Sequence, residues 1–237
     1  MAVIDKLLMS PAREKPRLAA MNEPHLACVL LLDTSGSMAG DSIDSLNKAI
    51  NQFKEKTMLD ELAKKRVDVA IVKFDDTAEL VQDFTPISEM QPVHLETGGM
   101  TSMCAGIDMA IDLVKERNRL YSSMGTPCFK PWIFMITDGE PTDYSDIPRV
   151  AQRIKEESSK GTHGKLKFFA LGVPGYSREV LVELTDKVME LADTDFSGIF
   201  NWISESMTTI SVSRVGDNVQ LPVLPDNARI VPSDWGS

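Results

Sequence analysis

The sequence predicts a doubly wound α/β domain, with a mostly parallel six-stranded sheet and helices on both of its faces. Apolar runs typical of strands buried on both faces recur at Ala27–Asp33, Val67–Phe74 and Trp132–Thr137. Longer stretches with apolar residues at helical spacing separate them, and strands that alternate with helices form a parallel sheet. The 237 residues, 43% hydrophobic and 25% charged, suit one such domain with small appendages.

The predicted elements alternate regularly along the chain. A long helix follows the first strand, because apolar residues recur there at helical spacing on one face. Residues 78–84 alternate between apolar and polar, as expected of a short antiparallel strand at an edge of the sheet. In order, the prediction gives strand Ala27–Asp33, helix Ser42–Lys64, strand Val67–Phe74, strand Ala78–Phe84, helix Ser102–Arg119, strand Trp132–Thr137, helix Asp146–Ser159, strand Leu166–Leu171, helix Arg178–Lys187, strand Val188–Leu191 and helix Ser197–Ser211.

Two segments flank the predicted domain, which covers residues 25–213. Residues 1–24 mix basic residues with prolines and suggest a flexible or loosely docked arm, or else a short helix over Ile4–Met9. Residues 214–237 contain three prolines and spaced apolar residues, so this tail is expected to be extended rather than helical. A disordered tail, a strap across the domain surface and a partner-binding segment all remain open for it.

Polar side chains follow the first strand at alternate positions. Asp33, Ser35 and Ser37 come directly after the apolar run, and Gly36 lets the backbone curl so that the three side chains converge. Oxygen ligands of mixed charge suit a hard cation such as Mg²⁺ or Mn²⁺. The pattern alone is weak, because Asp33 is equally well explained as a cap of a turn.

Two further stretches strengthen this pattern. Asp138 follows the fourth strand, and a glycine turn delivers Thr101 just before a predicted helix. In the strand order 3-2-1-4-5-6, the first and fourth strands flank the switch point, where open α/β sheets bind ligands. Alone, Thr101 is better explained as a helix N-cap and Asp138 as a turn residue. Together, on these elements and in this order, the five side chains predict a metal site.

These residues carry a resemblance to a known family. Asp33-x-Ser35-x-Ser37, Thr101 and Asp138 resemble, at every position, the metal-ion-dependent adhesion site (MIDAS) of the von Willebrand factor type A (VWA) domain. Within that family the sequence looks most like bacterial single-domain proteins associated with tellurium resistance, called TerY-like. Three segments within residues 24–213 carry this closer similarity: Leu31–Gly40, Lys130–Asp143 and Asp195–Ser213.

The resemblance implies a division of roles within the site. Ser35 and Ser37 would ligate Mg²⁺ or Mn²⁺ through their hydroxyls, and Thr101 would do so directly or through water. Asp33 and Asp138 would lie partly in the outer shell and hold water ligands. With few direct carboxylates the cation keeps an open octahedral position, which in this family accepts an Asp or Glu from a protein partner.

The resemblance also implies a biological setting. It indicates a scaffold or adhesion module in a tellurium-resistance or stress-response assembly, accompanied by a Ser/Thr kinase and a metal-dependent protein phosphatase. A metal-dependent hydrolase, such as a phosphatase using the same cation as Lewis acid, is the alternative. Against it, the sequence lacks a G-x-S-x-G elbow, a phosphate loop and a G-x-G-x-x-G motif, and no histidine or lysine is placed beside the site. We therefore expect a binding module and not an enzyme.

The net charge and the cysteine content indicate which partners and which cellular location to expect. The formal net charge of −10 argues against nucleic acid and against an anionic membrane surface, both of which need a basic face. The three cysteines form no C-x-x-C pair, which favours reduced thiols. No secretory signal or hydrophobic run of spanning length is present, so we expect a cytoplasmic protein.

Methionines surround the predicted site in the sequence. Met103 is expected in the core, whereas Met38 and Met100 are open between core packing and an apolar rim around a partner's carboxylate. Each of the three histidines, His25 among them, stands beside turn residues and is expected in a surface loop rather than in a ligand set.

Overall fold

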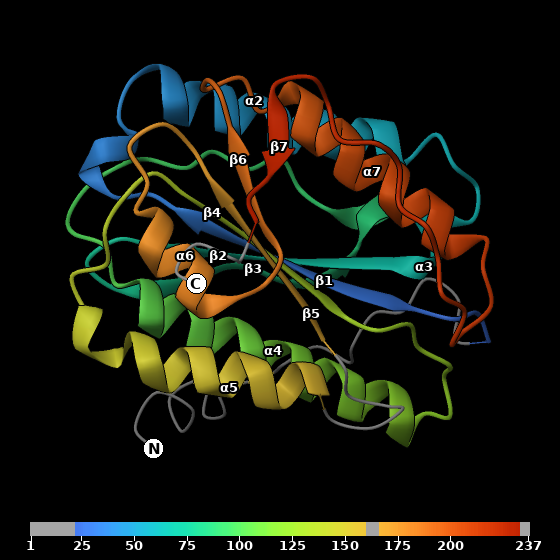
Figure 1. Cartoon of the computed structure of the whole chain (residues 1–237). Helices are drawn as coiled ribbons and strands as arrows, with labels where there is room; N and C mark the ends of the chain where they lie inside the picture. The colour runs from blue at the N-terminus through green and yellow to red at the C-terminus, as the bar shows by residue number, and fades with distance from the viewer. Residues whose placement is uncertain (1–21, 160–165, 233–237) are drawn as a thin grey trace.

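Strands and helices alternate along the chain in the predicted order (Figure 1). The computed structural model describes residues 22–159 and 166–232, so most of the predicted arm, residues 1–24, lies outside the described residues. The elements are β1 (Leu26–Asp33), α2 (Asp41–Thr57), α3 (Ala63–Arg66), β2 (Val67–Phe74), β3 (Ala78–Pro86), α4 (Met103–Ser123), β4 (Trp132–Thr137), α5 (Ile147–Ser159), β5 (Lys167–Gly172), α6 (Arg178–Leu184), β6 (Val188–Leu191), α7 (Ser197–Ser211) and β7 (Ala228–Ile230).

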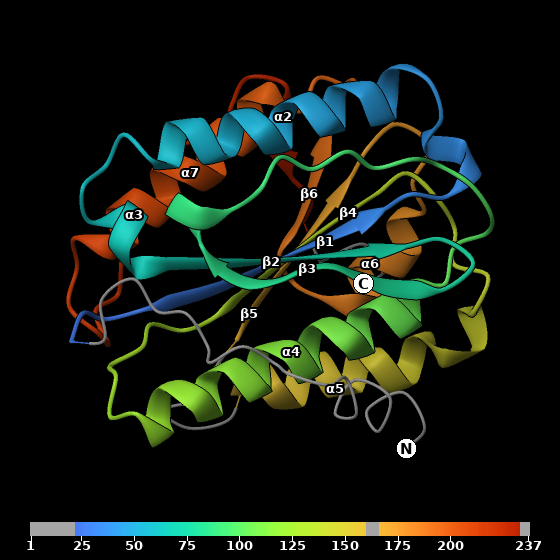
Figure 2. The same cartoon turned by 180° about the vertical axis from the view of Figure 1, so that it is seen from behind.

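One sheet runs through the middle of the molecule in the order β3-β2-β1-β4-β5-β6-β7. The five inner strands are parallel, while β3 pairs antiparallel with β2 and β7 pairs antiparallel with β6. α2 and α7 cover one face, and α4 and α5 cover the other (Figures 1 and 2). The doubly wound α/β class and the order of the first six strands are confirmed. The expected count of six strands with one antiparallel edge is wrong, because the described residues form seven strands and both edge strands are antiparallel.

The central strand β1 separates two hydrophobic cores. Leu30 and Leu32 point into the core beneath α2 and α7, whereas Val29 and Leu31 point into the core above α4 and α5. This explains the uninterrupted apolar run, since a strand covered on both faces has no solvent side. Full burial of each such side chain stabilises the fold by about 1.5–3 kcal/mol, which fixes the register of β1 and the position of its last residue, Asp33.

The predicted helix Ser42–Lys64 is wrong in length. α2 ends at Thr57, and a separate short helix, α3, begins after a turn. Asp60 Oδ1 accepts hydrogen bonds from the backbone N–H groups of Leu62, at 3.0 Å, and Ala63, at 2.6 Å. Such side-chain capping satisfies the first N–H groups of a new helix, so the chain breaks here although the apolar spacing continues.

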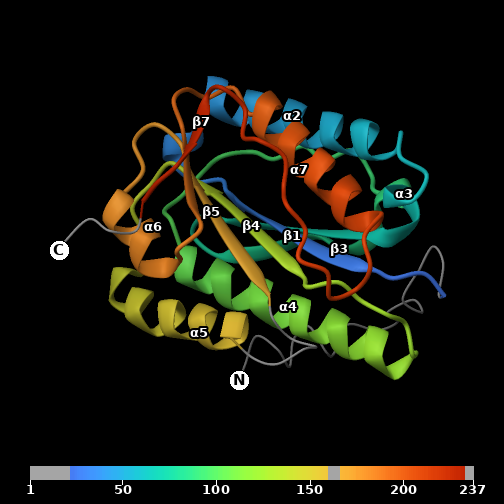
Figure 3. The same cartoon turned by 45° about the vertical axis from the view of Figure 1, so that its right-hand side comes forward.

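The described part of the tail passes over α7 and forms a strand at the edge of the sheet (Figure 3). Trp202 Nε1 on α7 donates a hydrogen bond of 2.9 Å to Pro222 O, and Leu221 and Leu224 pack against the core beside α7. Residues 228–230 then form β7 along β6. Of the three alternatives for the tail, these contacts match a strap across the domain surface. The strand was not predicted because its three residues contain no distinctive apolar pattern, and its pairing depends on the open edge of β6.

We predict that a chain ending at Ser213 remains folded but loses stability. The deletion removes β7 and the buried parts of Val219, Leu221, Leu224 and Val231. The lost burial is partly offset by the released chain entropy, and a net loss of about 2 kcal/mol, or 4–8 °C in Tm, is expected. Thermal unfolding checks this, with a chain ending at residue 232 as the control that keeps β7. Equal Tm values for the two chains would contradict a stabilising strap.

The expectation that His25 lies in a surface loop is wrong. His25 is fully buried, and its Nδ1 lies 2.8 Å from Oδ2 of the buried Asp68 on β2. Tyr121 donates its hydroxyl hydrogen to the same oxygen, and Arg117 NH2 lies 3.2 Å from it. No sequence pattern predicts this cluster, because its members are distant along the chain and meet only at the amino ends of the strands.

Candidate metal centre

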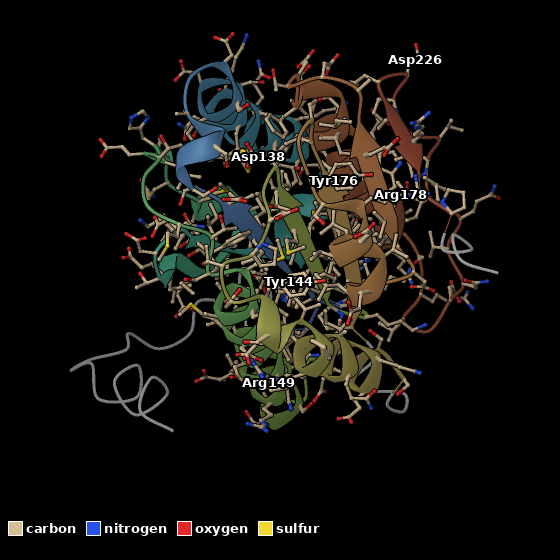
Figure 4. The ribbon with its side chains drawn as sticks, turned by 60° about the vertical axis from the view of Figure 1, so that its left-hand side comes forward. Asp138, Tyr144, Arg149, Tyr176, Arg178 and Asp226 are labelled. Atoms are coloured by element: carbon tan, nitrogen blue, oxygen red, sulfur yellow. The ribbon has the colours of Figure 1, made fainter. Side chains whose placement is uncertain are left out.

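The predicted site residues meet at the carboxyl ends of β1 and β4, which are neighbouring strands. Asp33 is the last residue of β1, and Asp138 directly follows β4 (Figure 4). Thr137, the last residue of β4, donates a hydrogen bond of 2.5 Å from Oγ1 to Asp33 Oδ2. The parallel register of β1 and β4 therefore brings two carboxylates, 105 positions apart in the sequence, to one end of the sheet.

The loop after β1 curls tightly, as predicted. Asp33 Oδ1 accepts a hydrogen bond of 2.8 Å from the backbone N–H of Ser35, and a turn of 3₁₀ helix, Gly36–Met38, follows. The hydroxyl oxygens of Ser35 and Ser37 lie 3.0 Å apart. Ser37 Oγ also donates a hydrogen bond of 2.7 Å to Asp138 Oδ1, which ties this loop to the one after β4.

A third loop carries Thr101 to the same place. The backbone N–H of Gly36 donates to Gly99 O at 3.3 Å, and that of Thr142 donates to Thr101 O at 2.9 Å. The Thr101 loop therefore contacts both the loop after β1 and the loop after β4. Thr101 is buried, as are Asp33, Ser35 and Asp138, while Ser37 is exposed to solvent.

Gly139 shows how closely the oxygen atoms converge. A Cβ atom placed on Gly139 would lie 3.5 Å from Thr101 Oγ1, 3.6 Å from Ser37 Oγ and 3.7 Å from Asp33 Oδ2. Oxygen atoms from the end of β1, from the loop after it and from the Thr101 loop thus surround one point beside the glycine, which lies on the loop after β4. The absence of a side chain at residue 139 leaves this cradle open.

Burial sets the electrostatics of the two carboxylates. Removal from water raises the pKa of Asp33, although hydrogen bonds from Ser35 and Thr137 oppose the shift. Removal from water also raises the pKa of Asp138, against the hydrogen bond from Ser37. Within residues 22–159 and 166–232, neither carboxylate forms an ion pair with a basic side chain. The pair is thus an uncompensated concentration of negative charge.

This donor set fits a hard divalent cation. Two carboxylates and three hydroxyls supply oxygen atoms only, and a cation in the cradle would compensate the buried charge. No group of three or more His, Cys, Asp or Glu side chains in the described part of the chain has metal-binding geometry, so a site here must use hydroxyl oxygens. That the five predicted residues ligate a metal remains a prediction.

We predict that Asp33→Asn separates fold stability from metal binding. A raised pKa means that the folded metal-free protein binds a proton more tightly than the unfolded chain. The free energy of unfolding of the metal-free protein therefore falls as pH rises from about 4 through the folded-state pKa. At pH 7.5 in EDTA, Asp33→Asn is expected to match or exceed the Tm of the unsubstituted protein, and to gain nothing from Mn²⁺.

Thermal unfolding at pH 5 and pH 7.5, with EDTA or with Mn²⁺, checks this prediction. Asp226→Asn, at an exposed position, is the matched control and should respond to Mn²⁺ like the unsubstituted protein. A lower Tm of Asp33→Asn in EDTA at pH 7.5 would show that the Asp33 carboxylate stabilises the metal-free fold.

Two positioning features of the site were not predicted. The sequence predicts Thr137 only as the end of a strand, because its bond to Asp33 depends on the register of two strands distant in sequence. Asp76, just after β2, accepts at Oδ1 a hydrogen bond of 2.8 Å from the N–H of Met100, a contact between two loops that no local pattern indicates. Of the three methionines near the site, Met103 is buried in the core as expected. Met38 is also buried in the core, whereas Met100 is exposed.

Comparison with known proteins supports the fold. The sequence model of the von Willebrand factor type A domain family matches residues 28–197. The search of curated proteins gave no match. None of the helices in the described ranges has the length and apolar character that a membrane crossing requires.

Several solved structures share the fold at low sequence identity. The pilus adhesin SpaC from Lactobacillus rhamnosus GG gives a TM-score of 0.63 at 14% identity, over 80% of this chain and 30% of that one. The ArnB paralog VWA2 from Sulfolobus acidocaldarius gives 0.50 at 14%, over 78% and 46%. Proximal thread matrix protein 1 from the mussel byssus, in a structure with a zinc-occupied MIDAS motif, gives 0.50 at 16%, over 81% and 47%. The chain thus spans less than half the length of each of these three proteins.

Proposed function

We propose that this chain, which belongs to the von Willebrand factor type A domain family, is a metal-dependent protein-binding module. Its bound cation would accept an Asp or Glu carboxylate from a protein partner. The observation that carries the proposal is the convergence of oxygen atoms of Asp33, Ser37 and Thr101 around Gly139. We propose Mg²⁺ as the cation, with Mn²⁺ as the alternative, because both favour oxygen ligands.

Each side chain has a role in this proposal. Ser35, Ser37 and Thr101 would offer neutral hydroxyl oxygens to the cation, and Asp33 and Asp138 would balance its charge and orient its water ligands. When bound, the cation supplies an electrophilic position open to an outside carboxylate. Exposed Ser37 marks the side from which a partner can approach, since the other four residues are buried.

The similar proteins support a binding role. A pilus adhesin and a byssal thread protein share the fold, and the latter has a structure with zinc in its MIDAS motif. We propose binding without catalysis, because the five side chains include no histidine, lysine or cysteine to transfer a proton near neutral pH. A metal-dependent hydrolase would need such a group or an activated water positioned by the two carboxylates.

We also propose the narrower setting that the sequence suggests. The resemblance to TerY-like proteins through residues 130–143 and 195–213 supports a tellurium-resistance or stress-response assembly, with a Ser/Thr kinase or a metal-dependent protein phosphatase as partner. Cys28, Cys104 and Cys128 form no disulfide bond, which supports a cytoplasmic location. The net charge of −10 supports a protein partner rather than nucleic acid or a membrane.

We predict that Ser35→Ala combined with Ser37→Ala leaves the fold intact and abolishes binding of Mg²⁺ and Mn²⁺. The double substitution removes two of the proposed hydroxyl ligands and neither adds nor removes a charge. Titration calorimetry of metal-free protein with each cation measures the effect. Ser122→Ala combined with Ser123→Ala is the matched control, since both serines lie about 30 Å from the site, at the far end of α4. Stoichiometric binding by the Ser35/Ser37 variant would show that the site lies elsewhere.

The same variants test the partner. The tagged protein is incubated with lysate of its own cells in Mg²⁺ or in EDTA, and the captured proteins are identified. A partner retained in Mg²⁺ by the unsubstituted protein and the control, and lost in EDTA and from the Ser35/Ser37 variant, supports the proposal. Retention of the partner by all forms in both buffers would place the interface away from the metal.

A further inference from the structure

Two large apolar side chains are exposed on the loops of the metal centre. Met100, directly before Thr101, is 59% exposed, and Tyr144, on the loop after β4, is 57% exposed. Tyr144 is labelled in Figure 4. Single exposed apolar residues are common on protein surfaces and need no explanation. Here two of them lie on the loops of one site, and hydrogen bonds hold the backbone beside each of them.

The backbone that carries Met100 is held rigidly. Its N–H donates to Asp76 Oδ1 at 2.8 Å, and Ser102 Oγ donates to Asp76 O at 2.8 Å. The Asp76 carboxylate also packs directly on Gly99, where a Cβ would come within 2.4 Å of its Cγ, and Gly99 has a φ of 69°. The Met100 side chain is thus presented by a backbone fixed on both sides, which lowers the entropy cost of binding.

The backbone that carries Tyr144 is held by the Thr101 loop and by the first turn of α4. Thr142 N–H donates to Thr101 O at 2.9 Å, and Ala105 N–H, in the first turn of α4, donates to Asp143 Oδ2 at 3.2 Å. Met100 and Tyr144 therefore flank the contact between Thr101 and Thr142. Thr101 is also one of the residues whose oxygen atom faces the cradle beside Gly139, so the apolar pair borders the metal centre.

Three further exposed residues on or beside these loops are acidic. Glu96 precedes the glycine turn, Glu140 follows Gly139, and Asp41 begins α2 just after the Ser37 loop, and all three are exposed. A partner segment rich in acidic residues would be repelled by this rim, whereas basic side chains would be attracted. The charge of the rim therefore favours a single carboxylate in a segment that is otherwise neutral or basic.

We propose that Met100 and Tyr144 form a specificity surface for a partner segment in which the metal-bound Asp or Glu is flanked by an apolar side chain and by basic rather than further acidic residues. The proposal rests on the proposed function, because it needs the carboxylate to bind the metal. The metal would select the acid, and the apolar pair and the acidic rim would select its neighbours. Contact of one apolar side chain with the pair is expected to raise affinity about tenfold.

Peptide selection tests this directly. A phage library of heptapeptides with a central Asp or Glu and random flanking residues is panned on the immobilised protein in Mn²⁺ and eluted with EDTA. The same panning uses Met100→Ser with Tyr144→Ser, and as control Leu59→Ser, which removes an apolar side chain that is 83% exposed. Leu59 follows α2, about 25 Å along that helix from the metal centre. Calorimetry with Mn²⁺ is run on every variant.

Supporting results are enrichment of apolar residues beside the acid and depletion of further acids, with the unsubstituted protein and with Leu59→Ser. In the Met100/Tyr144 variant, apolar enrichment should disappear while Mn²⁺ affinity and selection of one acid persist. Selection of acidic peptides with no apolar preference, or with a preference that survives the double substitution, overturns this inference and leaves the proposed function standing. Failure to recover any EDTA-eluted peptide, although Mn²⁺ binds, overturns the proposed function and this inference with it.

Discussion

Gly139→Val is expected to abolish binding of Mg²⁺ and Mn²⁺ while the protein remains folded. The Cβ itself would sit at ordinary contact distance, 3.5–3.7 Å, from oxygen atoms of Thr101, Ser37 and Asp33. The two methyl groups beyond it must then occupy the cradle between those atoms or push them apart. Changes behind the ligands alone cost about 10–100-fold in metal affinity, so obstruction of the cradle should cost more.

Backbone strain does not complicate this experiment. Gly139 is not among the glycines with positive φ, so valine is compatible with the backbone there. Gly98→Val, on the neighbouring Thr101 loop, is the matched control, because a Cβ at that position would meet no atom within 4 Å. Calorimetry with Mn²⁺ and thermal unfolding in EDTA separate lost binding from lost stability. Full binding by Gly139→Val would mean that the cradle is not the metal site.

Part of the candidate site could be predicted from the sequence pattern, and part could not. Asp33, Ser35 and Ser37 were predictable because a local curl after a buried strand brings alternate side chains together. The approach of Asp138 followed from topology, since the first and fourth strands of this fold are neighbours. The bond from Thr137 to Asp33 was not predictable, because it depends on a register that only the packed core fixes.

In the fold, too, features set by local sequence were predictable, whereas features set by contacts between distant segments were not. Strands buried on both faces, such as β2 and β4, were predicted to the residue, because their apolar runs begin and end with their burial. The break after α2 depends on one capping side chain, Asp60, within a pattern that remains helical. β7 depends on a free strand edge elsewhere in the chain. Local chemistry therefore predicted the elements, while contacts between distant segments decided the exceptions.

The buried cluster around Asp68 is one such set of distant contacts. Asp68 Oδ2 accepts from Tyr121 and lies 2.8 Å from His25 Nδ1 and 3.2 Å from Arg117 NH2. The Arg117 guanidinium lies 5.4 Å from the centre of the Phe84 ring, and Arg117 itself is only 5% exposed. A charge buried in this way depends on its counter-charge, because water cannot replace the lost partner.

Asp68→Ala is therefore expected to lower the free energy of unfolding by about 3–5 kcal/mol, since it breaks a buried ion pair by removing one partner. For a chain of this size the corresponding fall in Tm is about 6–20 °C. Asp112→Ala is the matched control, because it breaks a partly exposed pair with Arg153 that is worth about 1 kcal/mol at most. Denaturant and thermal unfolding in EDTA measure both variants.

A second substitution distinguishes the charge from the packing. If the broken Asp68–Arg117 pair causes the loss, then Asp68→Leu with Arg117→Met should recover much of the stability, because an apolar pair needs no counter-charge. No recovery would assign the loss to the contacts of His25 and Tyr121 instead. Mn²⁺ affinity should be unchanged in each variant, since β1 separates the cluster from Asp33 by about 25 Å. Altered affinity would reveal coupling between the two ends of the sheet.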